Sequence, residues 1–182
     1  MAFTAKSYSH NQPQYLPKKP VKSFQDLEVY QKALEASVFV AKTLAGAVEA
    51  KGNETAKDGG TKETAGKSQE QCRQRDVRER DDLIFRNMLP CALGLPHLIA
   101  AAHSVRFGAG SECLSTLEKV MLNCNKMVVY LEQTRDICQP DIAWEQFDEL
   151  IKKYLYIRRK TLNLQRSWKK YIILNKAEDS AN

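Results

Sequence analysis

The chain has 182 residues, of which 43% are hydrophobic and 27% are charged, and it carries a formal net charge of +6. This composition is ordinary for a globular protein and excludes the collagen-like and wholly disordered classes, and the length requires no more than one domain. The apolar runs fall far short of the ~20 residues that a membrane-spanning helix needs, and residues 1–20 contain no hydrophobic signal core. We therefore expect a cytoplasmic protein.

The cysteines favour free thiols in a reducing compartment over a structural or redox site. Their number is odd, no C-x-x-C pair occurs, and no histidine stands at zinc-ligand spacing. Four of the five fall inside helical patterns, where a thiol behaves as a small hydrophobic group. We expect no metal site and no cofactor to involve Cys72, Cys91, Cys113, Cys124 and Cys138.

The first ordered element is predicted to begin near Ser23. Residues 1–22 contain three prolines, which break helices, and are predicted to form a flexible basic lead-in. Ser23 can cap a helix, and Asp26 stands three positions later, as in a capping box. The helix that follows should bury a stripe at alternating spacings of three and four, made of Phe24, Leu27, Gln31, Leu34, Val38, Ala41, Ala45 and Val48.

Residues 51–80 form a polar stretch with four glycines, charges of both signs and almost no large apolar side chain. Such a segment cannot bury enough surface to offset the entropy of ordering it. We therefore predict a disordered insertion at about 51–75, within the bundle, between the first and second helices. Its arginine-rich end is a candidate start for the second helix.

The second helix is predicted to follow Asp81 and Asp82, whose carboxylates suit a helix N-terminus. Pro90 and Pro96 should bend it. The turn at 107–110 ends it. Its apolar stripe is Ile84, Met88, Cys91, Leu95, Leu98, Ala102 and Val105.

Two further helices complete the expected fold. The third is capped by Ser111 and carries the stripe Leu114, Leu117, Met121, Cys124, Val128 and Leu131. The fourth follows Pro140 and Asp141, runs to about residue 176, and carries Phe147, Leu150, Tyr154, Ile157, Thr161, Leu164, Trp168 and Tyr171. Four such stripes joined by short turns predict an all-α, antiparallel up-down-up-down four-helix bundle over residues 23–176, followed by a tail at 177–182.

Two segments carry a resemblance to a known family. The run Phe24-Gln25-Asp26-Leu27-Glu28-Val29-Tyr30-Gln31-Lys32-Ala33-Leu34 closely resembles the signature of four-helix-bundle proteins encoded within bacterial 23S rRNA intervening sequences. Those proteins share their fold with the accessory variability determinant of diversity-generating retroelements. The second segment matches at Pro96, Ile99, Ala100, Arg106 and the turn Phe107-Gly108, but Leu98, Ala101 and Ala102 stand where the family has Asn, Glu and Gly.

The resemblance implies a homopentameric ring of bundles. In the retroelement proteins the ring is a basic barrel that binds a reverse transcriptase and nucleic acid. The long insertion after the first helix departs from the family, whose members generally join these helices by a short turn.

No pattern in the sequence indicates catalysis. A di-iron bundle needs Glu three residues before an inward-facing His, and His10, His97 and His103 all lack that partner. The glycines form no phosphate-binding loop, and there is no nucleophile elbow. Acid pairs such as Asp148-Glu149 are explained by the helix dipole or by exposure. We expect a non-enzymatic protein with no catalytic residue.

The one localised signal is positive charge in the fourth helix. Residues 152–176 contain nine basic residues and no acid. At ~100° per residue, six side chains fall within roughly 80° and extend over ~27 Å, forming a basic ridge made of Lys152, Tyr156, Arg159, Asn163, Arg166 and Lys170. The predicted contacts to RNA or DNA are Lys152, Tyr156, Arg159, Arg166, Lys169 and Lys170, with Tyr156 stacking on an unpaired base. The alternative is a merely solvated face.

A second apolar strip lies beside the core stripe of the fourth helix. One bundle cannot easily bury both, so the strip predicts an oligomer interface made of Ile151, Leu155, Leu162 and Ile173. Packing under the N-terminal lead-in is the alternative. The leading hypothesis is a nucleic-acid-binding homo-oligomer that docks a reverse transcriptase, and its rival is a structural or protein-interaction bundle without a nucleic-acid role.

Overall fold

The computed structural model describes residues 23–44, 66–108 and 110–179, without the side chains of 66–71, 110 and 173–179. The predicted lead-in at 1–22, residues 45–65 with much of the predicted insertion, and residues 180–182 of the predicted tail lie outside the described residues. Ala45 and Val48 of the predicted first stripe are among them. Every element assigned among the described residues is a helix, so the all-α class is confirmed.

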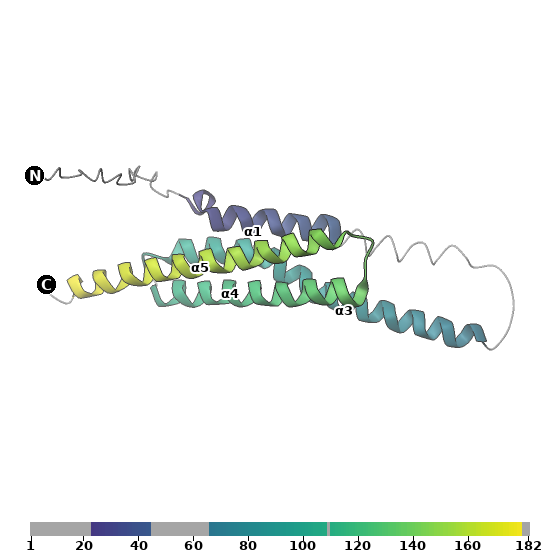
Figure 1. The fold of residues 1–182 in the computed structure, drawn as a ribbon. Helices are drawn as coiled ribbons and strands as arrows, with labels where there is room; N and C mark the ends of the chain where they lie inside the picture. The colour runs from purple at the N-terminus through teal and green to yellow at the C-terminus, as the bar shows by residue number, and fades with distance from the viewer. Residues whose placement is uncertain (1–22, 45–65, 109, 180–182) are drawn as a thin grey trace, which may run out of the picture.

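Four main helices make up the described fold (Figure 1). A short 3₁₀ turn, η1 (Phe24–Asp26), precedes α1 (Glu28–Phe39), which continues as the π-helical turn η2 (Val40–Leu44). The next helix is α3 (Gly66–Val105). It is followed by α4 (Gly110–Gln133), which continues as the π-helical turn η3 (Thr134–Cys138), and by α5 (Trp144–Asp179).

The predicted cap at Ser23 is confirmed. The Ser23 hydroxyl accepts a hydrogen bond from the backbone N–H of Gln25 at 3.3 Å, and the backbone N–H of Ser23 donates to the Asp26 carboxylate at 2.9 Å. These two bonds satisfy backbone groups that the first turn would otherwise leave unpaired. They therefore fix the entry of the chain into the bundle.

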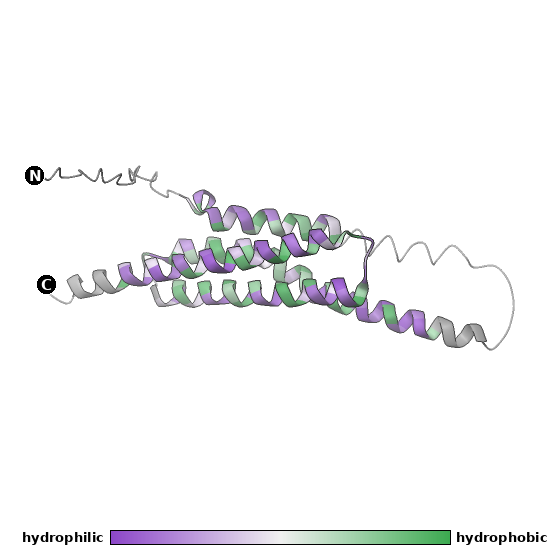
Figure 2. Ribbon diagram, viewed as in Figure 1, coloured by the Kyte–Doolittle hydropathy of each residue, from purple (hydrophilic) through white to green (hydrophobic). Residues whose placement is uncertain are grey.

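The predicted insertion at 51–75 is too long, because α3 already begins at Gly66. Residues 72–80 are helical although all of them are exposed, and Figure 2 shows this part of α3 as largely hydrophilic where it extends beyond the bundle. Lys, Glu, Gln and Arg are good helix formers, and Arg75 pairs with Glu79 one turn later at 3.3 Å. A lack of apolar residues therefore did not prevent a helix here.

The stripe predicted for the first helix is confirmed at Leu27, which is buried, and at Phe24, which packs against the core, but it is wrong further along the helix. Gln31, Leu34 and Val38 are exposed, whereas the core face of α1 and η2 consists of Val29, Ala33, Ala36, Val40 and Leu44. Small alanines on the inner face let the backbone of α1 approach its neighbours closely, and the larger Leu34 and Val38 are left outside. A polar Gln31 in the middle of the predicted stripe was the sign of the wrong register.

The other stripes are largely correct, with local shifts. On α3, Cys91 and Leu98 were predicted to be core residues but are only half-buried. Their neighbours Ala92 and Ile99 are fully buried instead. On α4 the predicted stripe mixes buried and half-buried positions, and the fully buried residues that it misses are Cys113, Val120 and Met127. The α5 stripe is confirmed from Phe147 to Thr161.

The end of the α5 stripe departs from the prediction. Leu164 and Trp168 are half-buried and pack against a small separate core formed by Ala102, Cys113 and Leu117. Tyr171, predicted as a core residue, is 50% exposed. The helix nevertheless continues to Asp179, beyond the predicted end near residue 176.

One stretch of α3 corrects the expectation about membrane helices. By length and composition alone, Cys72–Val105 is apolar enough to cross a membrane, and 39% of its most apolar window is buried inside the protein. Charged residues are sparse in that window even though its uninterrupted apolar runs are short. Its buried side chains, such as Met88, Leu95 and Ile99, belong to the core of the bundle, and one helix of this kind is weak evidence for a membrane span.

Candidate nucleic-acid interface

The predicted basic residues of α5 lie on its exposed side. Five of these residues are exposed and form no ion pair with another described residue. They are Lys152, Arg159, Arg166, Lys169 and Lys170. Asn163 is exposed between them. Lys169 points about 100° away from Lys152 around the helix axis, so it stands at the side of the ridge. The structure therefore brings together a row of cations with no acid bound to it.

Tyr156 has a different environment from the other ridge residues. It is half-buried, and its hydroxyl donates a hydrogen bond to the carboxylate of Glu28 on α1. The Lys160 ammonium lies 5.2 Å from the ring centroid, and the Arg159 guanidinium carbon lies 5.9 Å from it. Both the hydroxyl and the ring of Tyr156 already have partners within the protein, which leaves less of it to receive a base.

The side of α5 that faces α1 is electrostatically matched to that helix. The ammonium of Lys153 lies 2.6 Å from Glu35, and that of Lys160 lies 2.8 Å from Glu28. The hydrogen bond from Lys153 is the main reason why the pKa of Glu35 is lowered, and the bond from Lys32 adds to it. The hydrogen bond to Glu28 likewise raises the pKa of Lys160. These lysines hold α5 to α1 and differ in this respect from the ridge.

The predicted oligomer strip is only partly exposed. Ile151 is half-buried and packs against the main core, so it is not available as a surface residue in the way that the strip required. Leu155 is 49% exposed, and Leu162 is half-buried. The side chain of Ile173 lies outside the described residues. Leu155 is therefore the member of the strip that is open to another molecule.

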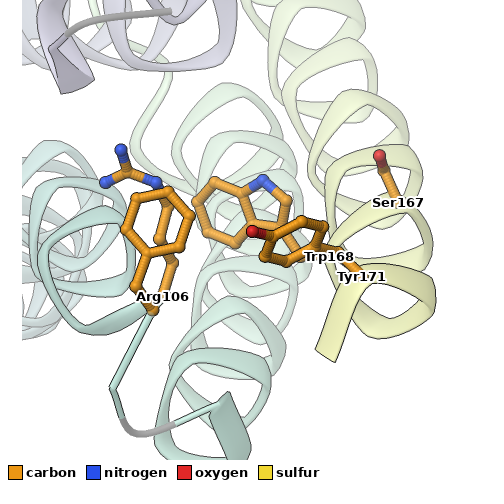
Figure 3. A pocket seen from close by; sticks show the side chains of 5 residues that line it. Arg106, Ser167, Trp168 and Tyr171 are labelled. Carbon is orange, nitrogen blue, oxygen red and sulfur yellow. The ribbon is translucent and has the colours of Figure 1, made fainter. Parts of the chain in front are cut away.

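An aromatic pocket, absent from the sequence prediction, lies at the end of the ridge (Figure 3). It is a cavity of about 360 Å³ between the end of α3 and the last described side chains of α5, lined by Arg106, Phe107, Ser167, Trp168 and Tyr171. In Figure 3, Trp168 and Tyr171 reach from α5 toward Arg106. We call this set the end pocket.

The rings of the end pocket are held in a defined arrangement and yet remain open to solvent. Phe107 is 71% exposed and Tyr171 is 50% exposed. Their ring centroids are 6.1 Å apart with planes at 68°, an edge-to-face pair. The Arg106 guanidinium carbon lies 4.1 Å from the centroid of the Phe107 ring.

His103 lies behind the pocket and orients Arg106. The Arg106 guanidinium donates to the backbone carbonyl of His103 and to its Nδ1, the latter at 2.8 Å. The centroid of the His103 imidazole lies 6.4 Å from the centroid of the Phe24 ring and 6.2 Å from that of Trp168. Burial is the main cause that lowers the pKa of His103, and the charge of Arg106 adds to it, so the ring is neutral at pH 7.

The tautomer of His103 follows from these contacts. Because Nδ1 accepts from Arg106, the ring hydrogen sits on Nε2. That nitrogen is buried and has no hydrogen-bond partner among the described residues. The neutral ring therefore accepts a hydrogen bond from Arg106 at Nδ1, and its other neighbours are the aromatic rings of Phe24 and Trp168.

Sequence reasoning missed the end pocket because it assigned its members to other roles. The sequence pattern places Phe107 in a turn and predicts Trp168 and Tyr171 as the continuation of a core stripe. The available signal was the position of these aromatic residues along α5, opposite the α3–α4 turn, where the bundle ends and few neighbours remain to bury them.

The described residues contain no group of three or more His, Cys, Asp or Glu side chains that could hold a metal ion. Burial raises the pKa of the Cys91 and Cys113 thiols, and that of Cys124 to about 12, so these thiols are protonated at neutral pH. No family model matches the chain, and neither a curated protein nor a solved structure matches it.

Proposed function

We propose that this protein is a non-enzymatic four-helix bundle that binds the backbone of RNA or DNA through the basic ridge of α5. The observation that carries the proposal is the row of exposed cations on that helix, none paired with an acid among the described residues. A helix face that serves only for solubility usually mixes both signs of charge. Uniform positive charge suits a polyanion.

The antiparallel up-down-up-down topology is part of the proposal. Phe24 precedes α1, His103 lies near the end of α3 and Trp168 lies late in α5, yet the His103 ring is a neighbour of both other rings. The start of α1 therefore meets the end of α3, as the proposed order of directions requires. α3 packs against α4 and α4 against α5, so neighbours in sequence are neighbours in space.

The binding mode should be independent of sequence. Arginines such as Arg159 and Arg166 can hold phosphate oxygens with two hydrogen bonds each, and the lysines act as point charges. Apart from these phosphate-binding cations, the ridge has no group of side chains arranged to hydrogen-bond the edges of paired bases. It should thus recognise the phosphate backbone.

Assembly and partners are a second part of the proposal, and they rest on the family resemblance. They comprise a homo-oligomer, a pentamer like that of the family that the chain resembles, that docks a reverse transcriptase in the cytoplasm. Leu155, exposed beside the ridge, supports a contact between copies. Replacing Leu155 and Leu162 with Glu should split the oligomer and preserve helicity. A wild type that light scattering shows to be monomeric at high concentration would remove this part.

One observation favours the rival function, a structural or protein-interaction bundle. Lys153 and Lys160 show that basic residues of α5 can serve to hold helices together, because both pair with acids of α1. In the rival account the ridge is the solvated remainder of a helix whose charge serves packing.

The two functions are separated by binding measurements over a salt series. The proteins are the wild type and the Arg159→Gln, Arg166→Gln double variant, and the ligands are single-stranded RNA and duplex DNA. Gln keeps the helix propensity, so a loss reports charge. Each lost phosphate contact should reduce the slope of log affinity against log salt by about 0.7 to 0.9. Equal affinity and slope for both proteins would favour the structural bundle.

A further inference from the structure

We propose that the end pocket holds one unpaired nucleobase of a single strand whose phosphates lie along the basic ridge. This inference rests on the proposed function and names its ligand more narrowly, as single-stranded nucleic acid. It also assigns the stacking role to Phe107, Trp168 and Tyr171 in place of Tyr156, whose hydroxyl is bonded to Glu28.

The shape and exposure of the pocket fit a planar aromatic group. Its volume of about 360 Å³ lies at the lower end of the range for small-ligand pockets. Phe107 at 71% exposure and Tyr171 at 50% leave two ring faces or edges in water at one place. Any base can stack on such rings because every base has a flat π-face.

The charges around the pocket select an anionic ligand. Arg106 lines it, and its α5 members Ser167 and Tyr171 each stand one residue after a ridge cation, Arg166 and Lys170. No acid lines it. An aromatic cage for a quaternary ammonium would be opposed by Arg106, whereas a nucleotide supplies both a planar ring and a negative phosphate.

The continuity of pocket and ridge requires the base to be unpaired. In a duplex the base faces are stacked on their neighbours and cannot reach protein rings without being flipped out. A single strand can lay its phosphates on Arg166 and Lys170 and turn one base toward Tyr171. The end pocket should therefore add affinity for single strands alone.

The test uses the fluorescence of Trp168 in the full-length chain. The protein contains two tryptophans, and Trp144 is 62% exposed at the start of α5, so Trp144→Phe leaves Trp168 as the sole reporter. The probes are a ten-nucleotide oligouridine and an RNA duplex of the same length. We expect the oligouridine to quench Trp168 and the duplex to leave it unchanged.

The matching affinity measurement compares Phe107→Ala, Tyr171→Ala with a control, Leu122→Ala, Val129→Ala, which truncates two exposed apolar residues of α4. Both positions in the pocket pair are at least half exposed, so folding should survive. Loss of stacking should weaken oligouridine binding roughly fivefold to a hundredfold while duplex binding and the salt slope stay unchanged. The control should bind like the wild type.

The outcomes distinguish this inference from the function on which it rests. If oligouridine binds with the expected salt slope but neither quenches Trp168 nor responds to the pocket variant, the pocket takes no base and the ridge proposal stands. Equal quenching by the duplex also overturns the inference. If the wild type binds neither probe at low salt, the proposed function itself fails, and the inference fails with it.

Discussion

Two clusters along α5, the second shared with the residues that follow α3, both combine aromatic and basic side chains but differ in their partners. In the middle of the helix, Tyr156 lies beside Arg159 and Lys160, and Glu28 of α1 bonds to the tyrosine hydroxyl and to the lysine. In the end pocket, Phe107 and Tyr171 lie beside Arg106, and the described residues that line the cavity include no acid. The polar groups of the first cluster are already bound by Glu28, whereas the rings of the second are exposed to solvent.

The difference teaches that an aromatic residue among basic ones does not by itself mark a ligand site. Whether such a cluster is free to bind a ligand depends on whether another helix supplies an acid that pairs with it. α1 carries Glu28 and Glu35 on the side that meets α5, and these acids neutralise the flank that they reach. The cations of the ridge and Arg106 of the end pocket form no ion pair with these acids, so their charge stays available.

The largest expected effect comes from removing the acids that close the middle cluster. In a Glu28→Gln, Glu35→Gln variant, Lys153 and Lys160 lose their partners and become available to phosphates. Single-stranded RNA should then bind more tightly, and the salt slope should rise by about 0.7 for each lysine that reaches the backbone. Filter binding over a salt series measures both quantities.

A matched control removes two exposed acids elsewhere. Glu79→Gln, Glu132→Gln changes the net charge by the same amount, but neither residue pairs with α5. If this control tightens binding as much as Glu28→Gln, Glu35→Gln does, the effect follows from net charge, and the contrast between the two clusters has no bearing on binding.

A smaller effect is expected from acidification of the end pocket. Because burial and Arg106 lower the pKa of His103 in the fold, the unfolded chain binds more protons than the folded one below the ordinary histidine value of about 6.5. Stability from this residue is therefore complete above pH 6.5 and falls as the pH drops from 6.5 toward the lowered pKa. Asp26, which acts in the opposite direction, reduces the loss.

Thermal unfolding of the wild type and of His103→Gln between pH 7.5 and 5.5 should show this difference. Gln is neutral throughout, so the variant should lose less stability on acidification. The carboxylates common to both proteins titrate alike and cancel in the comparison. Parallel pH profiles for the two proteins would show that His103 is not held neutral by the fold.

The smallest effect concerns the buried face of the same helix. The hydroxyl of Tyr154 is buried, has no hydrogen-bond partner among the described residues, and burial raises its pKa. Tyr154→Phe removes a polar group that gains nothing in the fold, so stability should be unchanged or slightly higher. A destabilisation of more than about 1 kcal/mol in urea unfolding would mean that the hydroxyl has a partner, such as a buried water.

The helical class and much of the core could be predicted from apolar spacing. The stripe of α5 from Phe147 to Thr161 is regular and rich in large side chains, which favours one register strongly. On α1 the inner face uses Ala33 and Ala36, whose small size gives a weak signal beside Leu34 and Val38. Spacing alone therefore selected the wrong face of that helix.

The ridge could be predicted because it depends on one helix and its 3.6-residue period. The end pocket could not, because it needs Phe107 from the end of α3 to meet Tyr171 of α5, a contact between residues far apart in sequence. The hydrogen bond between Tyr156 and Glu28 could not be predicted for the same reason, because Glu28 belongs to another helix. Sites within one helix are accessible to pattern reasoning, whereas sites between helices require their packing.

The most direct test of the account compares two variants that each lose two positive charges from α5. Arg159→Gln, Arg166→Gln removes ridge charges, and Lys153→Gln, Lys160→Gln removes charges that already pair with Glu35 and Glu28. Measured against single-stranded RNA over a salt series, the ridge variant should lose about 1.4 in slope, and the paired variant should keep the wild-type slope. Equal losses in the two variants would contradict the account, because net charge and not the unpaired ridge would then determine binding.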